Sequence, residues 1–169
     1  MSNFDSEKRP LWAPWRIKFI RSPKENRCFM CDNETPRDGS IEEPLIVARG
    51  KYVFAILNRY PYNSGHLLIA PYRHEGDIAK LSTEELHELM DFAVQAKKVM
   101  EKTLAPEAYN VGFNLGKPAG AGVAEHLHMH IVPRWTGDTN FMPVLADIHC
   151  VPEALEETAK LLRDNWDIV

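Results

Sequence analysis

The sequence lacks the features that define several large classes of protein. No apolar run in its 169 residues reaches the length of roughly 20 residues that a membrane-spanning helix needs. The first residues, MSNFDSEKRPLW, have no apolar core of the kind that a secretory signal carries. We therefore expect a cytoplasmic protein without a membrane partner.

The chain also lacks a strong excess of charge. Its 20 basic and 24 acidic side chains give a formal net charge of -4, so no overall field attracts nucleic acid and we expect no such partner. No predicted strand is followed by G-x-G-x-x-G opening a helix, which excludes a Rossmann dinucleotide site. An anionic ligand must then be held by local cationic or N–H groups.

Cysteine is scarce. An odd count of three, at Cys28, Cys31 and Cys150, argues against a disulfide framework. Cys28 and Cys31 form a C-x-x-C pair, which is typical of either a redox centre or half of a zinc site. Cys150 stands alone and is interpreted as a small buried apolar residue.

The apolar pattern predicts a single α+β domain. Short runs rich in β-forming residues predict strands over residues 45–48, 52–57, 66–70, 109–115 and 125–132. Because neighbouring strands are joined by short turns, we expect an antiparallel sheet and not a doubly wound one. Residues 1–27 are polar and basic apart from a Trp/Pro cluster, so we interpret them as an arm and residues 28–169 as the domain.

Two amphipathic helices are predicted beside this sheet. Ser82 opens the longer one, and Glu85 follows at the spacing of a capping box. The helix should end before Pro106, with a mostly apolar face formed by Leu86, Leu89, Met90, Ala93, Ala96, Lys97 and Met100. A second helix is expected over residues 152–166.

Three histidines alternate with apolar residues in the run His126-Leu127-His128-Met129-His130. Because successive residues of a strand point to opposite faces, the imidazoles share one face, and Leu127 and Met129 share the other, core-facing one. Imidazoles are poor core material. The pattern therefore favours a functional site over three separate structural histidines.

Metal binding and nucleophilic catalysis both suit this histidine face. One metal ion held by all three rings is strained, because the first and third Cα atoms lie about 13 Å apart along a strand, whereas zinc–imidazole bonds are about 2.0–2.1 Å long. A neutral imidazole is a good nucleophile near pH 7. Phosphorus is the electrophile that tolerates an N–P intermediate well, so the pattern favours a histidine nucleophile whose neighbours fix its tautomer and bind developing charge.

The run from His126 to Pro133 resembles the H-φ-H-φ-H-φ-φ-P signature of the histidine-triad family of nucleotide hydrolases and transferases. Residues 57–66 are similar to the family's nucleoside-contacting strand and upstream histidine, and Asn114 with the glycine-rich loop 116–122 is similar to its phosphate-side loop. The opening run 11–16 and the run 125–135 are most similar to the branch that contains bacterial diadenosine tetraphosphate phosphorylases.

The resemblance implies the histidine-triad fold, a five-stranded antiparallel sheet with one long helix and a C-terminal helix, in a chain that forms a homodimer. It implies that His128 attacks the α-phosphorus of a dinucleoside polyphosphate and becomes nucleotidylated. His130 and His66 would contact phosphate oxygens and assist the leaving group. Transfer to water is hydrolysis and transfer to phosphate is phosphorolysis, and both remain open.

The resemblance also implies a set of nucleotide-binding residues. Asn58 would bind the ribose hydroxyls, and Asn114 would hold phosphate together with backbone N–H groups of Gly120, Gly122 and Val123. From its place in the sequence, Phe54 is a further candidate, for a wall of the base pocket.

One departure from the family pattern concerns the residues before the triad. Many members have Gln and Ser or Thr there, with side chains that bind phosphate, whereas this chain has Gly122, Val123 and Ala124. Val123 has no side-chain donor, so backbone N–H groups must do more, as glycine loops can. This keeps open a nucleotide-binding or adaptor protein with weak catalysis; a hydrolase that uses zinc-bound water is a further alternative.

The C-x-x-C pair has candidate partners in His74 and His126. Cys28, Cys31, His74 and His126 make a Cys₂His₂ set suited to a closed tetrahedral zinc site, and part of the family is similar in using the first triad histidine as a ligand. A redox C-x-x-C normally opens a helix after a strand, whereas this one follows a basic tail. We expect a structural zinc ion that stabilises the fold and is not required for the chemical step.

Overall fold

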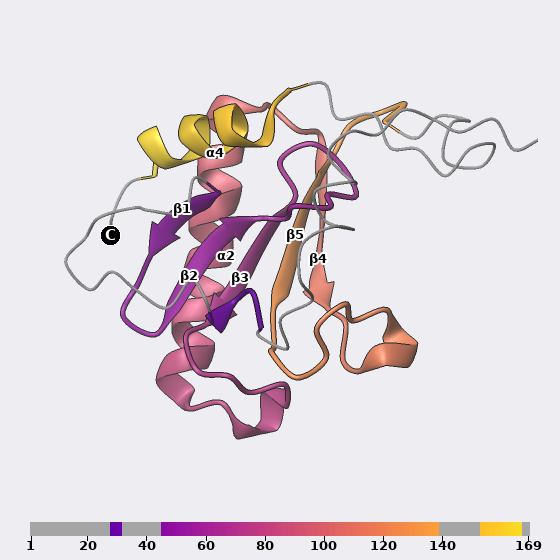
Figure 1. Cartoon of the computed structure of the whole chain (residues 1–169). Helices are drawn as coiled ribbons and strands as arrows, with labels where there is room; N and C mark the ends of the chain where they lie inside the picture. Colours follow the sequence, from indigo (N-terminus) through magenta and orange to yellow (C-terminus); the bar gives the residue numbers. More distant parts are fainter. Residues whose placement is uncertain (1–27, 32–44, 139–152, 167–169) are drawn as a thin grey trace, which may run out of the picture.

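A computed structural model describes residues 28–31, 45–138 and 153–166 of the chain. Their core is one antiparallel sheet of five strands in the order β1-β2-β3-β5-β4 (Figure 1). The strands are β1 (Ile46–Arg49), β2 (Val53–Leu57), β3 (Leu67–Pro71), β4 (Ala108–Phe113) and β5 (Met129–Arg134). The predicted α+β class and five-stranded antiparallel sheet are confirmed. The predicted arm over residues 1–27 and Cys150 lie outside the described residues.

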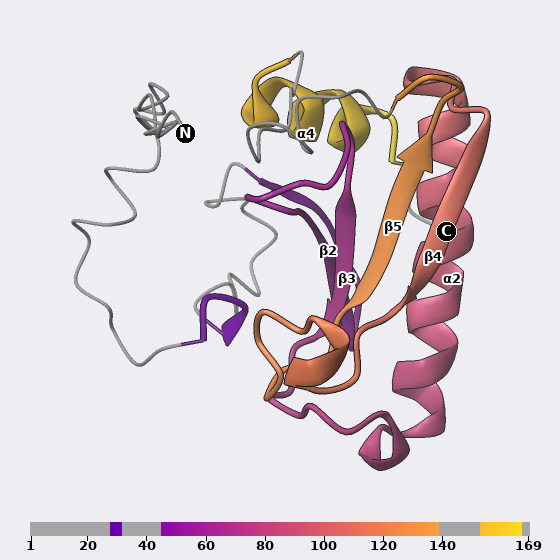
Figure 2. The same ribbon diagram turned by 90° about the vertical axis from the view of Figure 1, so that its right-hand side faces the viewer.

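The long helix α2 (Thr83–Thr103) covers one face of this sheet (Figure 2). Its predicted capping box is present, because Ser82 Oγ accepts from the Glu85 N–H at 3.2 Å and the Glu85 carboxylate accepts from the Ser82 N–H at 2.7 Å. Two predicted members of this face are exposed: Met90, at 55%, and Lys97. The buried stripe of α2 is narrower than the apolar pattern, and Met90 lies outside it.

A second helix, α4 (Leu155–Asp164), packs against β1, β2 and α2. Trp166, just after it, contacts Phe92 of α2 with ring centroids 5.5 Å apart. Two short 3₁₀ turns, η2 (Ile78–Lys80) and η3 (Lys117–Ala119), lie in the connections after β3 and β4. No helix in the described ranges has the length and apolarity to cross a membrane.

The last predicted strand differs most from its observed bounds. It was expected over residues 125–132 and runs instead from Met129 to Arg134, through Pro133. Pro133 lies beyond the part of β5 that pairs with β3, so the missing N–H is tolerated there. The ladders of β5 with β3 and with β4 both begin at Met129, and before it the Leu127 N–H donates to the Glu75 carbonyl instead. The alternating sequence pattern therefore predicted correctly which side chains face the core, but it did not predict which residues form the backbone ladder.

Candidate active site and metal centre

The segment that carries His126 and His128 is held against the turn that follows β3. The Leu127 N–H donates to the Glu75 carbonyl at 2.8 Å. Gly76 approaches the same segment so closely that an added Cβ would lie 2.3 Å from the Ala124 carbonyl oxygen. Only glycine permits that approach. Residues 75–76 therefore position the histidines, a contact between distant segments that the sequence pattern did not indicate.

The histidine run separates its side chains as predicted. Leu127 and Met129 join the hydrophobic core. The rings of His128 and His130 lie together with centroids 4.9 Å apart, while the ring of His126 meets His74 edge-on at 5.3 Å. The three histidines thus divide between two groups: His128 and His130 form a pair, and His126 lies in a cluster with His74 and the cysteines.

The four predicted metal ligands lie together. The candidate ligand atoms of Cys28, Cys31, His74 and His126 are all within 4.8 Å of one another. Cys31 Sγ is 3.2 Å from His74 Nδ1 and 3.5 Å from His126 Nδ1, and Cys28 Sγ is 3.4 Å from His126 Nδ1. A tetrahedral zinc ion spaces bound sulfur and nitrogen atoms roughly 3.5 Å apart. The residues therefore fit such an ion without large movement.

The orientation of His126 also suits a ligand. Its Nε2 is 2.8 Å from the Pro71 carbonyl oxygen, so Nε2–H donates and the unprotonated Nδ1 faces the sulfur atoms. Metal-binding histidines commonly donate their other N–H in this way. Burial lowers the pKa of His126, although the Pro71 carbonyl acts in the opposite direction. The neutral ring is thus ready to bind, in a four-residue set that leaves no open position for a substrate.

One hydrogen bond defines the tautomer of His128. Its Nδ1 is 2.8 Å from the carbonyl oxygen of His126, and a carbonyl can only accept, so the proton is on Nδ1. Burial lowers the pKa of His128, against the smaller opposite effect of that carbonyl. His128 is therefore a neutral ring with a free electron pair on Nε2, which is the form that a nucleophile requires.

A chain of hydrogen bonds gives His130 the opposite character. The Tyr62 N–H donates to His66 Nδ1 at 3.0 Å, and Asn58 Nδ2 lies 3.2 Å from the same nitrogen. The proton of His66 must then be on Nε2, which donates to His130 Nδ1 at 2.9 Å. His130 accordingly carries its proton on Nε2.

His130 Nε2 is buried and has no hydrogen-bond partner among the described residues. An unpaired buried N–H is unfavourable, and such atoms are rare in folded proteins outside functional sites. Here the donor lies beside the His128 ring. It is therefore suited to donate to an oxygen of a phosphate group whose phosphorus a nucleophilic His128 would attack.

We call the hydrogen-bonded pair of His66 and His130 the relay. Both histidines should make the free energy of unfolding depend on pH. Burial, followed by repulsion from His130 and His128, lowers the pKa of His66 to about 3, and burial and His128 lower that of His130 to about 4. An unfolded histidine titrates near 6.5. Below pH 6.5 the unfolded chain binds more protons than the folded chain does. Each of these histidines therefore lowers the free energy of unfolding by about 1.4 kcal/mol for every unit by which the pH decreases.

We therefore expect His66→Gln to flatten the stability profile between pH 7 and pH 5, by about the slope of one histidine. Chemical denaturation at several pH values measures it. His87→Gln is the control, because His87 is exposed on α2. An unchanged slope in His66→Gln, or an equal change in both variants, contradicts the burial of a neutral His66.

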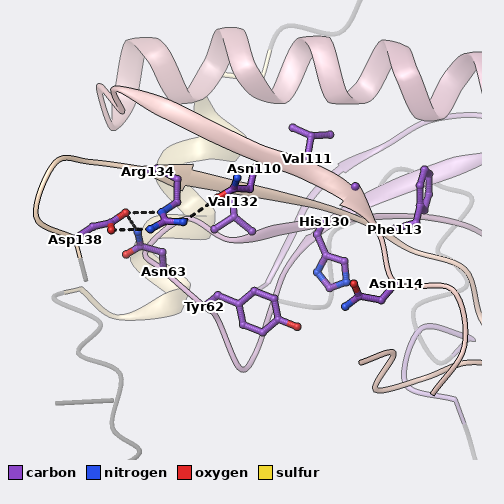
Figure 3. A pocket seen from close by; sticks show the side chains of 11 residues that line it. Tyr62, Asn63, Asn110, Val111, Phe113, Asn114, His130, Val132, Arg134 and Asp138 are labelled. Carbon is purple, nitrogen blue, oxygen red and sulfur yellow. Dashed lines mark hydrogen bonds and ion pairs between the residues drawn. The ribbon is translucent and has the colours of Figure 1, made fainter. Parts of the chain in front are cut away.

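A cavity of about 440 Å³ opens beside His130, between β4, β5 and the loop after β2 (Figure 3). At one end lie His130 and Asn114, and at the other lie Arg134 and Asp138. The ring of Tyr62 borders it between these ends, nearly parallel to His130 at 12° and 5.8 Å. Its volume lies in the range of roughly 300–1,000 Å³ that is usual for small-molecule sites.

The predicted nucleotide-binding residues occupy different places. Asn114 lines the cavity. Gly120 has φ of 91°, and a Cβ added to it would lie 3.7 Å from Asn114 Nδ2. Asn58 contacts Nδ1 of His66, the ring nitrogen that does not face His130. Val123 is partly buried and packs against the core, while a Cβ at Gly122 would meet nothing within 4 Å.

Phe54 does not border the cavity. It is wholly buried and stacks on Tyr72 with centroids 5.4 Å apart. Its place in the middle of β2 explains this burial, because both faces of that strand are covered. Sequence reasoning instead overlooked Tyr62 and Asn110, which do line the cavity; the aromatic and amide side chains at a loop and an edge strand were the available signals.

Comparison with known proteins agrees with this geometry. The model of the HIT domain family matches residues 42–137. AP-4-A phosphorylase from Mycobacterium tuberculosis is 41% identical over 162 residues, which cover 92% of this chain and 83% of the relative. The chain therefore belongs to the HIT (histidine-triad) family, and the family predicted from the sequence is confirmed.

Two further relatives are more distant. Bis(5'-nucleosyl)-tetraphosphatase [asymmetrical] from Schizosaccharomyces pombe is 34% identical over 90 residues, or 53% of this chain and 49% of the relative. A zinc-bound histidine triad family protein from Mycobacterium smegmatis has the same fold, with a TM-score of 0.63, 24% identity, and coverage of 82% of this chain and 90% of that one.

Proposed function

We propose that this chain transfers a nucleoside monophosphate from a dinucleoside polyphosphate to water or phosphate, through a covalent intermediate on His128 Nε2. The observation that carries the proposal is the pair of opposite tautomers, a free electron pair on His128 Nε2 beside an unpaired N–H on His130. Relatives named AP-4-A phosphorylase and bis(5'-nucleosyl)-tetraphosphatase support an enzyme of this class and this class of substrate.

The reaction proceeds by two displacements at the α-phosphorus. His128 Nε2 forms an N–P bond while the P–O bond to the rest of the polyphosphate breaks, and the departing oxygen keeps the electron pair. Water or phosphate then attacks the same phosphorus from the side that was vacated, and the N–P bond breaks. His130 Nε2–H donates to a phosphate oxygen in both steps and stabilises the developing charge.

The binding residues follow from the same arrangement. Asn114 and the backbone N–H groups around Gly120, Gly122 and Val123 hold phosphate oxygens, since Asn114 and Gly120 adjoin at the cavity beside His130. Asn58 holds the ribose of the nucleotide that is transferred. His66 acts through His130, because both of its ring nitrogens have partners in the relay.

We propose zinc for the Cys₂His₂ cluster, in a structural role. When bound, zinc ties residues 28–31 to the turn after β3 and to the ring of His126. Its four protein ligands leave no position for a water molecule, which weighs against a hydrolase that uses metal-bound water.

Product analysis tests the reaction. Diadenosine tetraphosphate should give ADP and ATP in the presence of phosphate if the acceptor is phosphate, and AMP and ATP without it if the acceptor is water. Tight nucleotide binding without turnover of any dinucleoside polyphosphate would instead support an adaptor protein, the alternative that Val123 motivates.

We also propose that two copies pair along α2 and the edge strand β4. Val111, Met90 and Val94 are 51–55% exposed there. Tyr109 of β4 donates to the Lys97 carbonyl of α2 at 3.2 Å, and Val111 points to the same side two residues on. The strip is apolar and lies beside a strand edge, which suits a self-complementary interface.

Val111→Lys should therefore convert a dimer to a monomer, with the mass in light scattering falling from about twice 19.3 kDa to that value. A buried unpaired ammonium strongly opposes association. Lys160→Glu, on the exposed side of α4, should leave the mass unchanged. A wild-type protein that is monomeric at micromolar concentration, or a Val111→Lys variant that stays dimeric, contradicts this interface.

A further inference from the structure

We infer that a groove along β4 and β5 binds the second nucleoside, the one that departs with the leaving group. This inference rests on the proposed function. The groove is the part of the cavity beyond His130, and we call it the distal groove; its residues are Tyr62, Asn63, Asn110, Val132, Arg134 and Asp138 (Figure 3).

The line of the displacement points the leaving group into the distal groove. The His128 ring adjoins that of His130, and Val132 and Arg134 continue the same side of the chain in steps of two residues. In phosphoryl transfer the attacking and leaving atoms lie roughly in line with the phosphorus. An attack from His128 on a phosphorus beside His130 therefore sends the leaving oxygen toward Val132 and Arg134.

The strand order also places the two nucleoside sites on opposite sides of the histidines. In the order β2-β3-β5-β4, Asn58 follows β2, on one side of His66 and His130, and Asn110 of β4 lies on the other. Asn110 pairs with Val132 and Gly112 pairs with His130. If Asn58 holds the ribose of the transferred nucleotide, the departing nucleoside must extend over β4.

The charge of the distal groove favours a nucleoside over a phosphate group. Arg134 donates to Asp138 through Nε at 2.6 Å and Nη2 at 2.9 Å, a two-pronged pair without net charge. Arg134 Nη1 also donates to Asn110 Oδ1 at 2.8 Å. A phosphate dianion gains little from a guanidinium that is already neutralised, whereas a base and a ribose are neutral and polar.

The remaining surfaces of the groove suit a base. The Tyr62 ring is 54% exposed, and Val132 forms a buried apolar floor. Asn110 Nδ2 has no partner within the described ranges and can donate to a base or ribose acceptor. A Cβ at Gly112 would meet nothing within 4 Å, so the floor is open next to His130. An aromatic face, an apolar floor and a few polar groups are what small-molecule sites combine.

Two substrates and two variants test this assignment. Diadenosine tetraphosphate carries the second nucleoside, and adenosine 5′-phosphorimidazolide presents the same AMP group with a small leaving group. Asn110→Tyr fills the groove from an exposed strand position that tolerates an aromatic residue. Asn110→Ala removes the amide only. Lys160→Tyr adds the same ring on the exposed side of α4 and is the matched control.

We expect Asn110→Tyr to lower kcat/KM for diadenosine tetraphosphate about tenfold or more, mainly through KM, because it excludes a stacked base. Asn110→Ala should lower it about fivefold. Both should turn over the imidazolide at the wild-type rate, with an unchanged KM for inorganic phosphate, and Lys160→Tyr should match wild type on both donors.

Three outcomes overturn the distal groove while the proposed function stands: equal losses on both donors, no loss on either, or a raised KM for inorganic phosphate alone, which would make the groove an acceptor site. A wild-type protein that turns over neither donor and forms no covalent adduct overturns the proposed function itself. The two failures are thus distinguished by the wild-type reactions.

Discussion

Replacing His128 with alanine should reduce turnover of diadenosine tetraphosphate on the order of 10⁴-fold, since removing a nucleophile leaves only binding and charge stabilisation. The cause is specific. His128 presents an unprotonated ring nitrogen next to the buried N–H of His130, because its other nitrogen donates to the His126 carbonyl. Steady-state product formation measures the loss, and nucleotide binding should persist.

A quench experiment separates this loss from a loss of folding. Wild-type protein mixed with labelled donor and denatured should retain an acid-labile, base-stable label, as expected of an N–P bond, and His128→Ala should retain none. His87→Gln, on the exposed side of α2, should behave as wild type. If His128→Ala keeps more than about a tenth of the activity at an unchanged melting temperature, the assigned nucleophile is wrong.

Removing the metal should cause the largest loss of stability. A ligand that binds only the folded chain stabilises it by about 4 kcal/mol when its free concentration is a thousand times its Kd. For a chain of this size that corresponds to a fall of roughly 8–16 °C in the melting temperature. We expect this fall on chelation, and on Cys31→Ala, whose Sγ lies 3.2 Å from His74 Nδ1.

Non-additivity identifies the cause of that fall. If Cys28 and Cys31 act through one shared ion, each single alanine variant loses it, and the double variant should be hardly less stable than either. Chelator should then have no further effect on any of the three, and metal analysis should find about one zinc ion per wild-type chain only. Additive losses in zinc-free protein would show independent packing contacts instead.

Local signals in the sequence predicted the features that local physics controls. The capping box of Ser82 and Glu85 depends on residues three apart and was found where expected. The alternation of Leu127 and Met129 with the histidines depends on side-chain facing and was also correct. The Cys₂His₂ grouping came from the family resemblance, and its four residues do lie together.

The sequence did not reveal features that depend on contacts between distant segments. The backbone between residues 125 and 128 is held by Glu75 and Gly76 and not by a strand, which no periodicity indicates. Phe54 is an aromatic residue of the kind that often lines a pocket. It is buried, however, because both faces of β2 are covered. The cavity itself brings together Tyr62 from the loop after β2 and Asn110 from β4. The cytoplasmic location expected from the sequence stays a prediction.

The hydrogen bonds that place the protons of His128 and His130 begin at main-chain groups of opposite kind. A carbonyl, at His126, makes His128 an electron-pair donor, and an amide N–H, at Tyr62, makes His130 a proton donor two rings later. Every amino acid carries both groups except proline, which lacks the N–H. The protonation of the two rings is thus insensitive to which side chain other than proline occupies position 62, provided that His66 is retained.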